Sequence, residues 1–196
     1  MSSNSHYMPN KAAEVAAFFL LKAEAALHII KIMKLMYLAE RESLLNFAEP
    51  LIGDSLVSMQ HGPVLSATYS QMRGDGQEDA QILWDSWIDE RTGHGVCIKP
   101  QHRHLNPDSE LLSLSDSDVD ILNTVWTKFG HMNTWALRDY THTAAVPEWQ
   151  DPDGSSLPIS YTQLFKAAGK PDAFVTGVIT RLSEQAAMRN AFAAKA

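Results

Sequence analysis

The sequence contains little cysteine, and its longest apolar run is short. Cys97 is the single cysteine among 196 residues, so it cannot form an intramolecular disulfide, and we expect a reducing compartment. The run from Ile29 to Ala39 includes two lysines and falls well short of the about 20 residues that a transmembrane helix requires. The polar start, MSSNSHYMPN, lacks the cationic segment of a secretion signal. These absences predict a cytoplasmic protein with no membrane span.

Basic residues are also scarce. The chain has 16 Lys and Arg against 23 Asp and Glu, which gives a formal net charge of -7. A protein that binds nucleic acid non-specifically usually presents a basic face, so nucleic acid is an unlikely partner. The hydrophobic fraction of 45% and the charged fraction of 20% are ordinary for a globular protein. At this length the core can be large enough to fold without a disulfide or a metal.

Motifs of common enzyme classes are missing as well. The sequence has no G-x-S-x-G, no HExxH and no phosphate-binding loop. We therefore predict a protein that is not an enzyme and uses no cofactor. One weak candidate for a metal site is the cluster His94, Cys97, His102 and His104, because zinc is bound by these residue types. The spacing fits no standard zinc finger, so a polar hairpin tip with solvated imidazoles is the favoured interpretation.

The most informative stretch is residues 27–47, LHIIKIMKLMYLAERESLLNF. Between Ile29 and Ala39, apolar side chains point to nearly every side of a helix, and such a helix is usually buried on all sides. Lys31 and Lys34 are three residues apart, so they share one side of it. Each lysine either reaches water along its aliphatic stem or meets a partner. The stretch predicts a central helix with other helices packed around it.

The rest of the chain predicts further helices and a small β element. Ser115, followed by Asp118, is a good start for a helix because the pair resembles a capping box. Gly62-Pro63 predicts a turn that opens a helix. The glycines near residue 94 predict a hairpin turn. Other helices are expected at about residues 10–26, 64–73, 115–130, 134–142, 160–168 and 172–192, with the hairpin at about 82–101.

The predicted fold is therefore mainly α, a single-domain helical bundle around a central apolar helix with a small β-hairpin. Residues 1–9 are expected to be a flexible tail and residues 10–168 the helical domain. Residues 169–196 are expected to form a helical extension packed on the same domain.

Three stretches together resemble the Panacea domain, also described as the SocA-like antitoxin domain. The first is IMKLMYLA at residues 32–39, and the second is His-Gly-Pro-Val at 61–64, followed by Tyr69. The third comprises VWTKFG at 125–130 and the segment 137–149, which contains LRDYTH and ends in PEW. Their order and separations agree with the family over about residues 10–168. Met33 stands where the family often has glutamine.

The resemblance implies an antitoxin from a toxin–antitoxin or prophage module that blocks a protein toxin by direct binding. One relative acts as an adaptor that presents its toxin to a protease, so a cellular protease is a further partner to consider, and a homo-oligomer stays open. The family shows no established catalytic activity. The residues that we expect at the toxin interface are Lys34, Tyr37, His61, Gly62, Pro63, Tyr69, Trp135, His142 and Trp149.

Three alternatives to this interpretation stay open. The motif residues could serve only the fold, since motifs in a core-facing helix often concern packing. The protein could be a phage or prophage accessory regulator that binds a host protein or nucleic acid. It could also be a metal-dependent enzyme that uses the histidine cluster.

Overall fold

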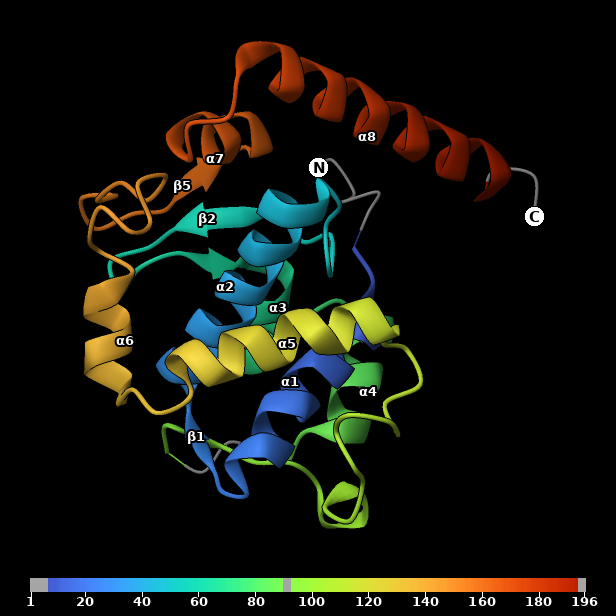
Figure 1. The fold of residues 1–196 in the computed structure, drawn as a ribbon. Coiled ribbons are helices and arrows are strands. Elements are labelled where there is room, and N and C mark those ends of the chain that lie inside the picture. The colour runs from blue at the N-terminus through green and yellow to red at the C-terminus, as the bar shows by residue number, and fades with distance from the viewer. Residues whose placement is uncertain (1–6, 90–92, 194–196) are drawn as a thin grey trace.

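The structure is a computed structural model that describes residues 7–89 and 93–193. It is mainly helical, as the sequence predicted, with helices gathered around α2 (Figure 1). The helices are α1 (Pro9–Ala23), α2 (Ile29–Phe47), α3 (Ser66–Arg73), α4 (Glu78–Trp87), α5 (Asp116–Phe129), α6 (Thr134–Tyr140), α7 (Tyr161–Ala167) and α8 (Asp172–Ala193), with a 3-10 turn at Pro100–His102. The strands are β1 (Leu27–His28), β2 (Leu56–Ser58), β3 (Val64–Leu65), β4 (Gly95–Val96) and β5 (Leu157–Ile159). Within the described residues, no helix combines the length and the apolar character needed to cross a membrane.

Helix α2 is the centre of the fold, which confirms the interpretation of the apolar stretch. It packs against α1, α5, α6 and β3 (Figure 1). Ile32, Leu35 and Met36 are fully buried, and each such side chain stabilises the fold by about 1.5–3 kcal/mol. The helix begins after His28, whose Nδ1 accepts a hydrogen bond from the backbone N–H of Ile30 at 3.2 Å.

A small antiparallel sheet joins the middle of the chain to its C-terminal part. Strand β2 lies between β3 and β5, and Leu56 faces both Leu65 and Ile159. The turn between β2 and β3 contains Gly62, whose φ of 89° lies in the left-handed region that favours glycine. Two backbone hydrogen bonds close this turn: Gly62 donates to Met59 at 2.9 Å and Met59 donates to Gly62 at 3.3 Å.

The hairpin predicted at 82–101 is present but begins later than expected, because residues 82–87 belong to α4. Trp84, Trp87 and Ile88 follow the i, i+3, i+4 spacing of a helix, and Trp84 is buried where α4 packs on α1. Antiparallel pairing begins only at Ile88, which bridges to Ile98. Strand β4 pairs with β1 at the entrance to α2. Residues 90–92, at the expected turn, lie outside the described residues.

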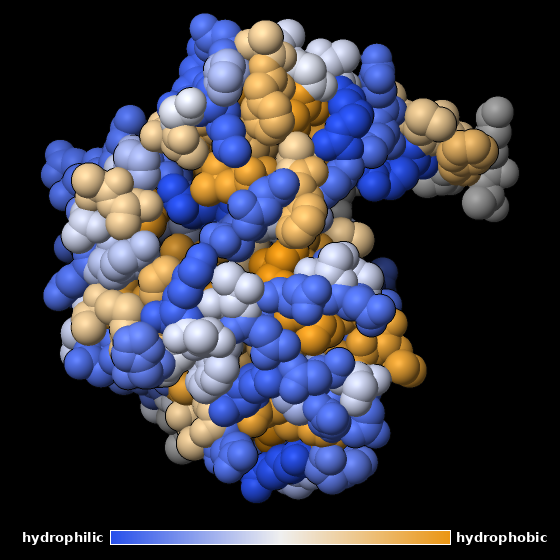
Figure 2. Space-filling model, viewed as in Figure 1, coloured by the Kyte–Doolittle hydropathy of each residue, from blue (hydrophilic) through white to orange (hydrophobic). Residues whose placement is uncertain are grey.

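The two ends of the chain attach differently. The predicted flexible tail falls mostly on residues 1–6, which lie outside the described residues, whereas Met8 donates its backbone N–H to Ile52 at 3.0 Å. At the other end, α8 buries Val175, Val178 and Leu182 and then runs away from the body (Figure 1). Figure 2 shows the same projection, with apolar colouring near its end. The division into a domain and an extension stays a prediction.

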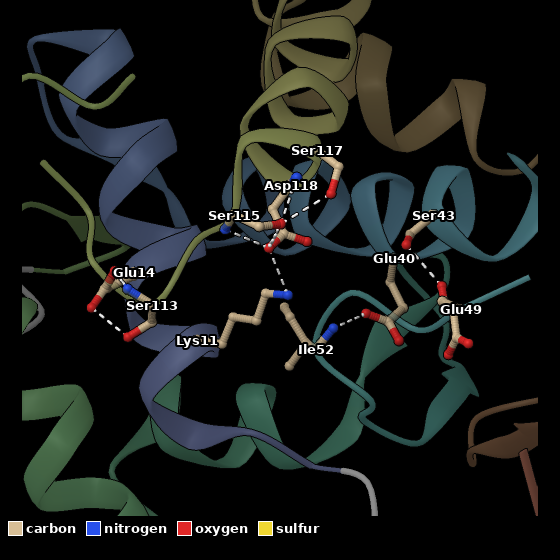
Figure 3. A network of polar contacts seen from close by, with 10 residues as sticks. All are labelled: Lys11, Glu14, Glu40, Ser43, Glu49, Ile52, Ser113, Ser115, Ser117 and Asp118. Carbon is tan, nitrogen blue, oxygen red and sulfur yellow. Dashed lines mark hydrogen bonds and ion pairs between the residues drawn. The ribbon is translucent and has the colours of Figure 1, made fainter. Parts of the chain in front are cut away.

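Polar contacts link α1 to the start of α5, and α2 to the segment that follows it (Figure 3). The predicted capping box at the start of α5 is present, because Asp118 and Ser115 each satisfy the backbone N–H of the other. Lys11 of α1 pairs with Asp118 at 2.8 Å. Glu40 of α2 is fully buried and accepts the backbone N–H groups of Ile52 at 2.6 Å and Gly53 at 3.1 Å. Burial raises the pKa of Glu40 to about 7.

Candidate partner-binding site

The sequence stretches singled out above converge around Lys34 of α2. Its side chain is 1% exposed, and its Nζ donates a hydrogen bond to the carbonyl oxygen of Pro63 at 2.7 Å. Gly62 closes the space above it: a Cβ at this position would lie 2.5 Å from Thr141 Oγ1 and 3.1 Å from Lys34 Nζ. The Gly62-Pro63 turn therefore holds the lysine between α2 and the end of α6, and no larger residue fits at position 62.

Lys34 and the Nε2 of the neighbouring His142 are both buried, with incomplete pairing among the described residues. No carboxylate pairs with Lys34 in the part of the chain that the structure describes, and burial lowers its pKa well below its ordinary value. His142 follows Thr141 and stacks on Trp149, with 4.1 Å between ring centroids. Its Nε2 is buried, with no hydrogen-bond partner among the described residues. Burial, and then the charges of Lys34 and Arg138, lower the pKa of His142.

One helical turn along α2, Tyr37 belongs to a closed buried cluster. Its hydroxyl donates to Glu148 Oε1 at 2.7 Å, and Arg41 Nε donates to the same oxygen at 2.6 Å. Glu148 and Tyr37 are both fully buried. Burial and then the Glu148 charge raise the pKa of Tyr37 well above its ordinary value. The cluster fastens the segment after α6 to α2, so Tyr37 is a core residue and not a contact surface.

Trp149 has a similar anchoring role. Its indole Nε1 donates to the carbonyl oxygen of Met59 at 3.1 Å, beside the turn at Gly62. Sequence reasoning placed the segment 147–149 in a motif but did not single out Glu148 or Arg41. Their opposite charges gave no signal, because 107 residues separate them in the chain.

Beside Lys34 lies a groove of about 460 Å³. It brings together five of the nine residues predicted for the interface, namely Lys34, His61, Gly62, Tyr69 and Trp135. The other four, Tyr37, Pro63, His142 and Trp149, do not line it and instead build the structure behind it. Lining residues that sequence reasoning missed include His28, Ile30, Met33, Met59 and His94. Ile30 and Met33 could have been found, because they lie one helical turn before Lys34 and Tyr37 on the same helix.

The rim of the groove is aromatic. Trp135 is 52% exposed, and its ring centroid lies 5.9 Å from that of His28. His28 in turn stacks on His94 at 5.4 Å, where β1 meets β4. The Arg138 guanidinium lies 5.2 Å from the centroid of the Trp135 ring. Trp135 lies at the start of α6, where Asn133 is the N-cap. The Asn133 Oδ1 accepts a hydrogen bond from the backbone N–H of Trp135 at 3.0 Å.

The candidate zinc cluster is not assembled. His94 stacks on His28, whereas His102 stacks on Trp87 at 4.2 Å and its Nε2 lies 3.0 Å from the Ser86 carbonyl oxygen. Cys97 Sγ lies 3.9 Å from a carboxylate oxygen of Asp89, and His104 is exposed. Across residues 7–89 and 93–193, no three His, Cys, Asp or Glu side chains are placed to hold one metal ion.

The family that carries these stretches is described as "Antitoxin SocA-like, Panacea domain", and it matches residues 32–150. The chain belongs to this family. The Panacea match begins on α2 and ends just after Trp149, so it contains every residue that we predicted for the interface and is shorter than the expected 10–168. No curated protein and no solved structure matches the chain.

Proposed function

We propose that this protein is the antitoxin of a toxin–antitoxin or prophage defence module, and that it neutralises a protein toxin by direct binding at the groove beside Lys34. Membership of an antitoxin family supports a toxin partner in general. The observation that carries the location is that five residues predicted from separate stretches line one groove. The remaining motif residues support its wall, so one surface accounts for the whole set.

The groove has the character of a protein-binding surface. Exposed Trp135 and half-buried Tyr69 are the residue types that most often anchor interfaces. Ile30 and Met33 supply apolar surface from the rigid central helix. A volume of about 460 Å³ accommodates a few side chains of a partner, within the usual range of binding pockets. The lysine amine is already bonded to a backbone carbonyl, which suits a binding role better than a catalytic one.

The test is co-expression with the product of the adjacent gene, using a matched pair of variants. Trp135→Ala removes the exposed anchor of the groove, whereas Ile82→Ala removes an apolar side chain of similar exposure, 62%, on α4. We expect wild type and Ile82→Ala to relieve toxicity and co-purify with the toxin. Trp135→Ala should weaken the complex by at least about 2 kcal/mol, as for an interface hot spot.

Circular dichroism first establishes that both variants fold. A folded wild-type protein that neither relieves the toxicity nor co-purifies with the product contradicts the proposal. The half-life of the toxin in the same cells distinguishes two mechanisms of neutralisation. A stable toxin in the complex indicates inhibition by occupancy, and a shortened half-life that depends on a cellular protease indicates an adaptor.

A further inference from the structure

We propose that the groove recognises a proline-containing segment: the stretch of toxin that enters it is uncharged, adopts the extended polyproline II conformation and packs its proline rings against the aromatic rings of the groove. This inference rests on the proposed function, because it names the chemistry of the partner at the same site. It follows from the charge, the rings and the free hydrogen-bond donors of the accessible lining.

When its histidines are neutral, the accessible lining of the groove is uncharged. No Asp, Glu or Arg belongs to the described residues that line it. The lysine there, Lys34, is 1% exposed and its amine is bonded to the Pro63 carbonyl oxygen, so it does not reach an incoming segment. Arg138, which lies over the Trp135 ring, is already paired with Asp139. A charged tail would lose hydration in this groove without gaining an ion pair, so an uncharged segment is the better match.

Aromatic rings dominate the accessible part of the lining. They come from β1, the residue before β4, the β2–β3 turn, α3 and α6, so the fold sets their positions before a partner arrives. Rings on a rigid scaffold lose little conformational entropy on binding, and grooves lined by them are the usual receptors of polyproline II segments. The five exposed or half-buried rings belong to His28, His61, Tyr69, His94 and Trp135.

Two of these rings carry hydrogen-bond donors that the fold does not use. The Trp135 indole Nε1 and the Tyr69 hydroxyl make no hydrogen bond within residues 7–89 and 93–193. An indole N–H can only donate. Proline has no backbone N–H, so a proline-rich segment offers carbonyl oxygens to such donors and brings few N–H groups that need an acceptor. Since no described carboxylate lines the groove, this is the segment that its free donors fit.

Apolar side chains complete the groove beside the rings. Ile30 and Met33 come from α2 and Met59 from the end of β2, and they leave room for an aliphatic side chain of the partner. A polyproline II helix has about three residues per turn and rises about 3.1 Å per residue, so prolines and an aliphatic residue alternate between its sides. The volume of about 460 Å³ suits a few residues of such a segment. We therefore expect prolines that flank a residue such as leucine.

Two blocked synthetic peptides serve as probes, acetyl-Gly-Pro-Pro-Leu-Pro-Pro-Gly-amide and its counterpart with Ala in place of each Pro. Binding to the full, isotope-labelled chain is measured by NMR titration of the backbone amide and indole N–H signals. We expect the proline peptide to bind about tenfold tighter or better, because it is already extended and its rings pack on those of the groove. It should also shift the Trp135 indole signal, which the Trp135→Phe variant identifies by its absence.

The variants separate the ring from its donor. Trp135→Phe keeps a ring but removes the indole N–H, so the affinity for the proline peptide should fall about fivefold, as for one lost hydrogen bond. Trp135→Ala removes both, and the two peptides should then bind almost equally. Trp87→Phe is the matched control, because the Trp87 ring stacks on His102 and does not line the groove. It should keep the full preference for the proline peptide.

Equal binding of the two peptides by wild type, no binding of the proline peptide at millimolar concentration, or an undiminished preference in folded Trp135→Ala overturns the inference. If Trp135→Ala does not fold, Trp135→Phe and the wild-type comparison decide. Neutralisation lost in Trp135→Ala, together with equal peptide binding, leaves the proposed function standing and removes only the proline chemistry. A preference for the proline peptide without neutralisation of the toxin contradicts the proposed function and leaves the recognition of proline standing.

Discussion

Helix α2 buries two ionisable side chains of opposite sign, and their surroundings differ. Glu40 is fully buried and accepts the backbone N–H groups of Ile52 and Gly53, the first of which is drawn in Figure 3. Lys34 is almost as buried but donates to one carbonyl oxygen, beside a groove that no Asp or Glu of residues 7–89 and 93–193 lines. The first group completes the fold. The second is a buried lysine with no carboxylate partner among the described residues, so the two groups are accommodated on one helix in different ways.

The largest effect on stability is expected from substitution of Gly62, the glycine that lies against Lys34 and Thr141. Gly62→Ala introduces a Cβ 2.5 Å from Thr141 Oγ1 at a φ of 89°, so strain and overpacking add. We expect the free energy of unfolding to fall by roughly 4 kcal/mol, measured by urea denaturation. Gly154→Ala is the control, because its φ of 81° is similar but a Cβ there meets nothing within 4 Å. Equal losses in the two variants would show that the turn does not clamp the lysine.

The second-largest expected effect is a pH dependence of the free energy of unfolding that is caused by Glu40. Its folded pKa of about 7 lies above the ordinary value of 4.5, so the folded state binds more protons than the unfolded state between these values. Stability should therefore fall as pH rises through this window, by about 3 kcal/mol from this group. Urea denaturation at several pH values measures the slope, and Glu40→Gln should flatten it. A slope that Glu40→Gln leaves unchanged would mean that another group titrates.

The smallest effect on stability is expected at Lys34. In Lys34→Met, removal of a buried cation offsets the lost hydrogen bond to Pro63, so the free energy of unfolding at neutral pH should change by less than about 1 kcal/mol. The lysine has a lowered folded pKa, so the unfolded state binds more protons, and wild-type stability should rise with pH below the ordinary value of 10.5. The variant should lose this rise. A loss of several kcal/mol at neutral pH would make Lys34 a structural group like Glu40.

Much of the fold could be predicted from local sequence. The capping pair Ser115 and Asp118 and the apolar run of α2 are short-range signals, and both predictions are confirmed. The hairpin was placed too early because Trp84 and Trp87 were interpreted as strand residues, although their spacing with Ile88 is helical. In the structure α4 packs on α1 and Trp84 is buried, which favours the helix over a strand. The contact joins residues far apart in the sequence, so local patterns did not reveal it.

The sequence by itself determined that a mainly helical chain forms around α2, and its motifs marked five of the residues that line the groove. Only the tertiary structure decided what each one does. Tyr37 and Trp149 hold the wall through Glu148 and Met59, whereas Trp135 faces outward at the rim. The apolar run alone left Lys34 with two choices, water or a partner. In the structure Lys34 lies buried beneath Gly62, so its amine does not reach water. A long side chain reaches water only where no neighbouring segment covers it.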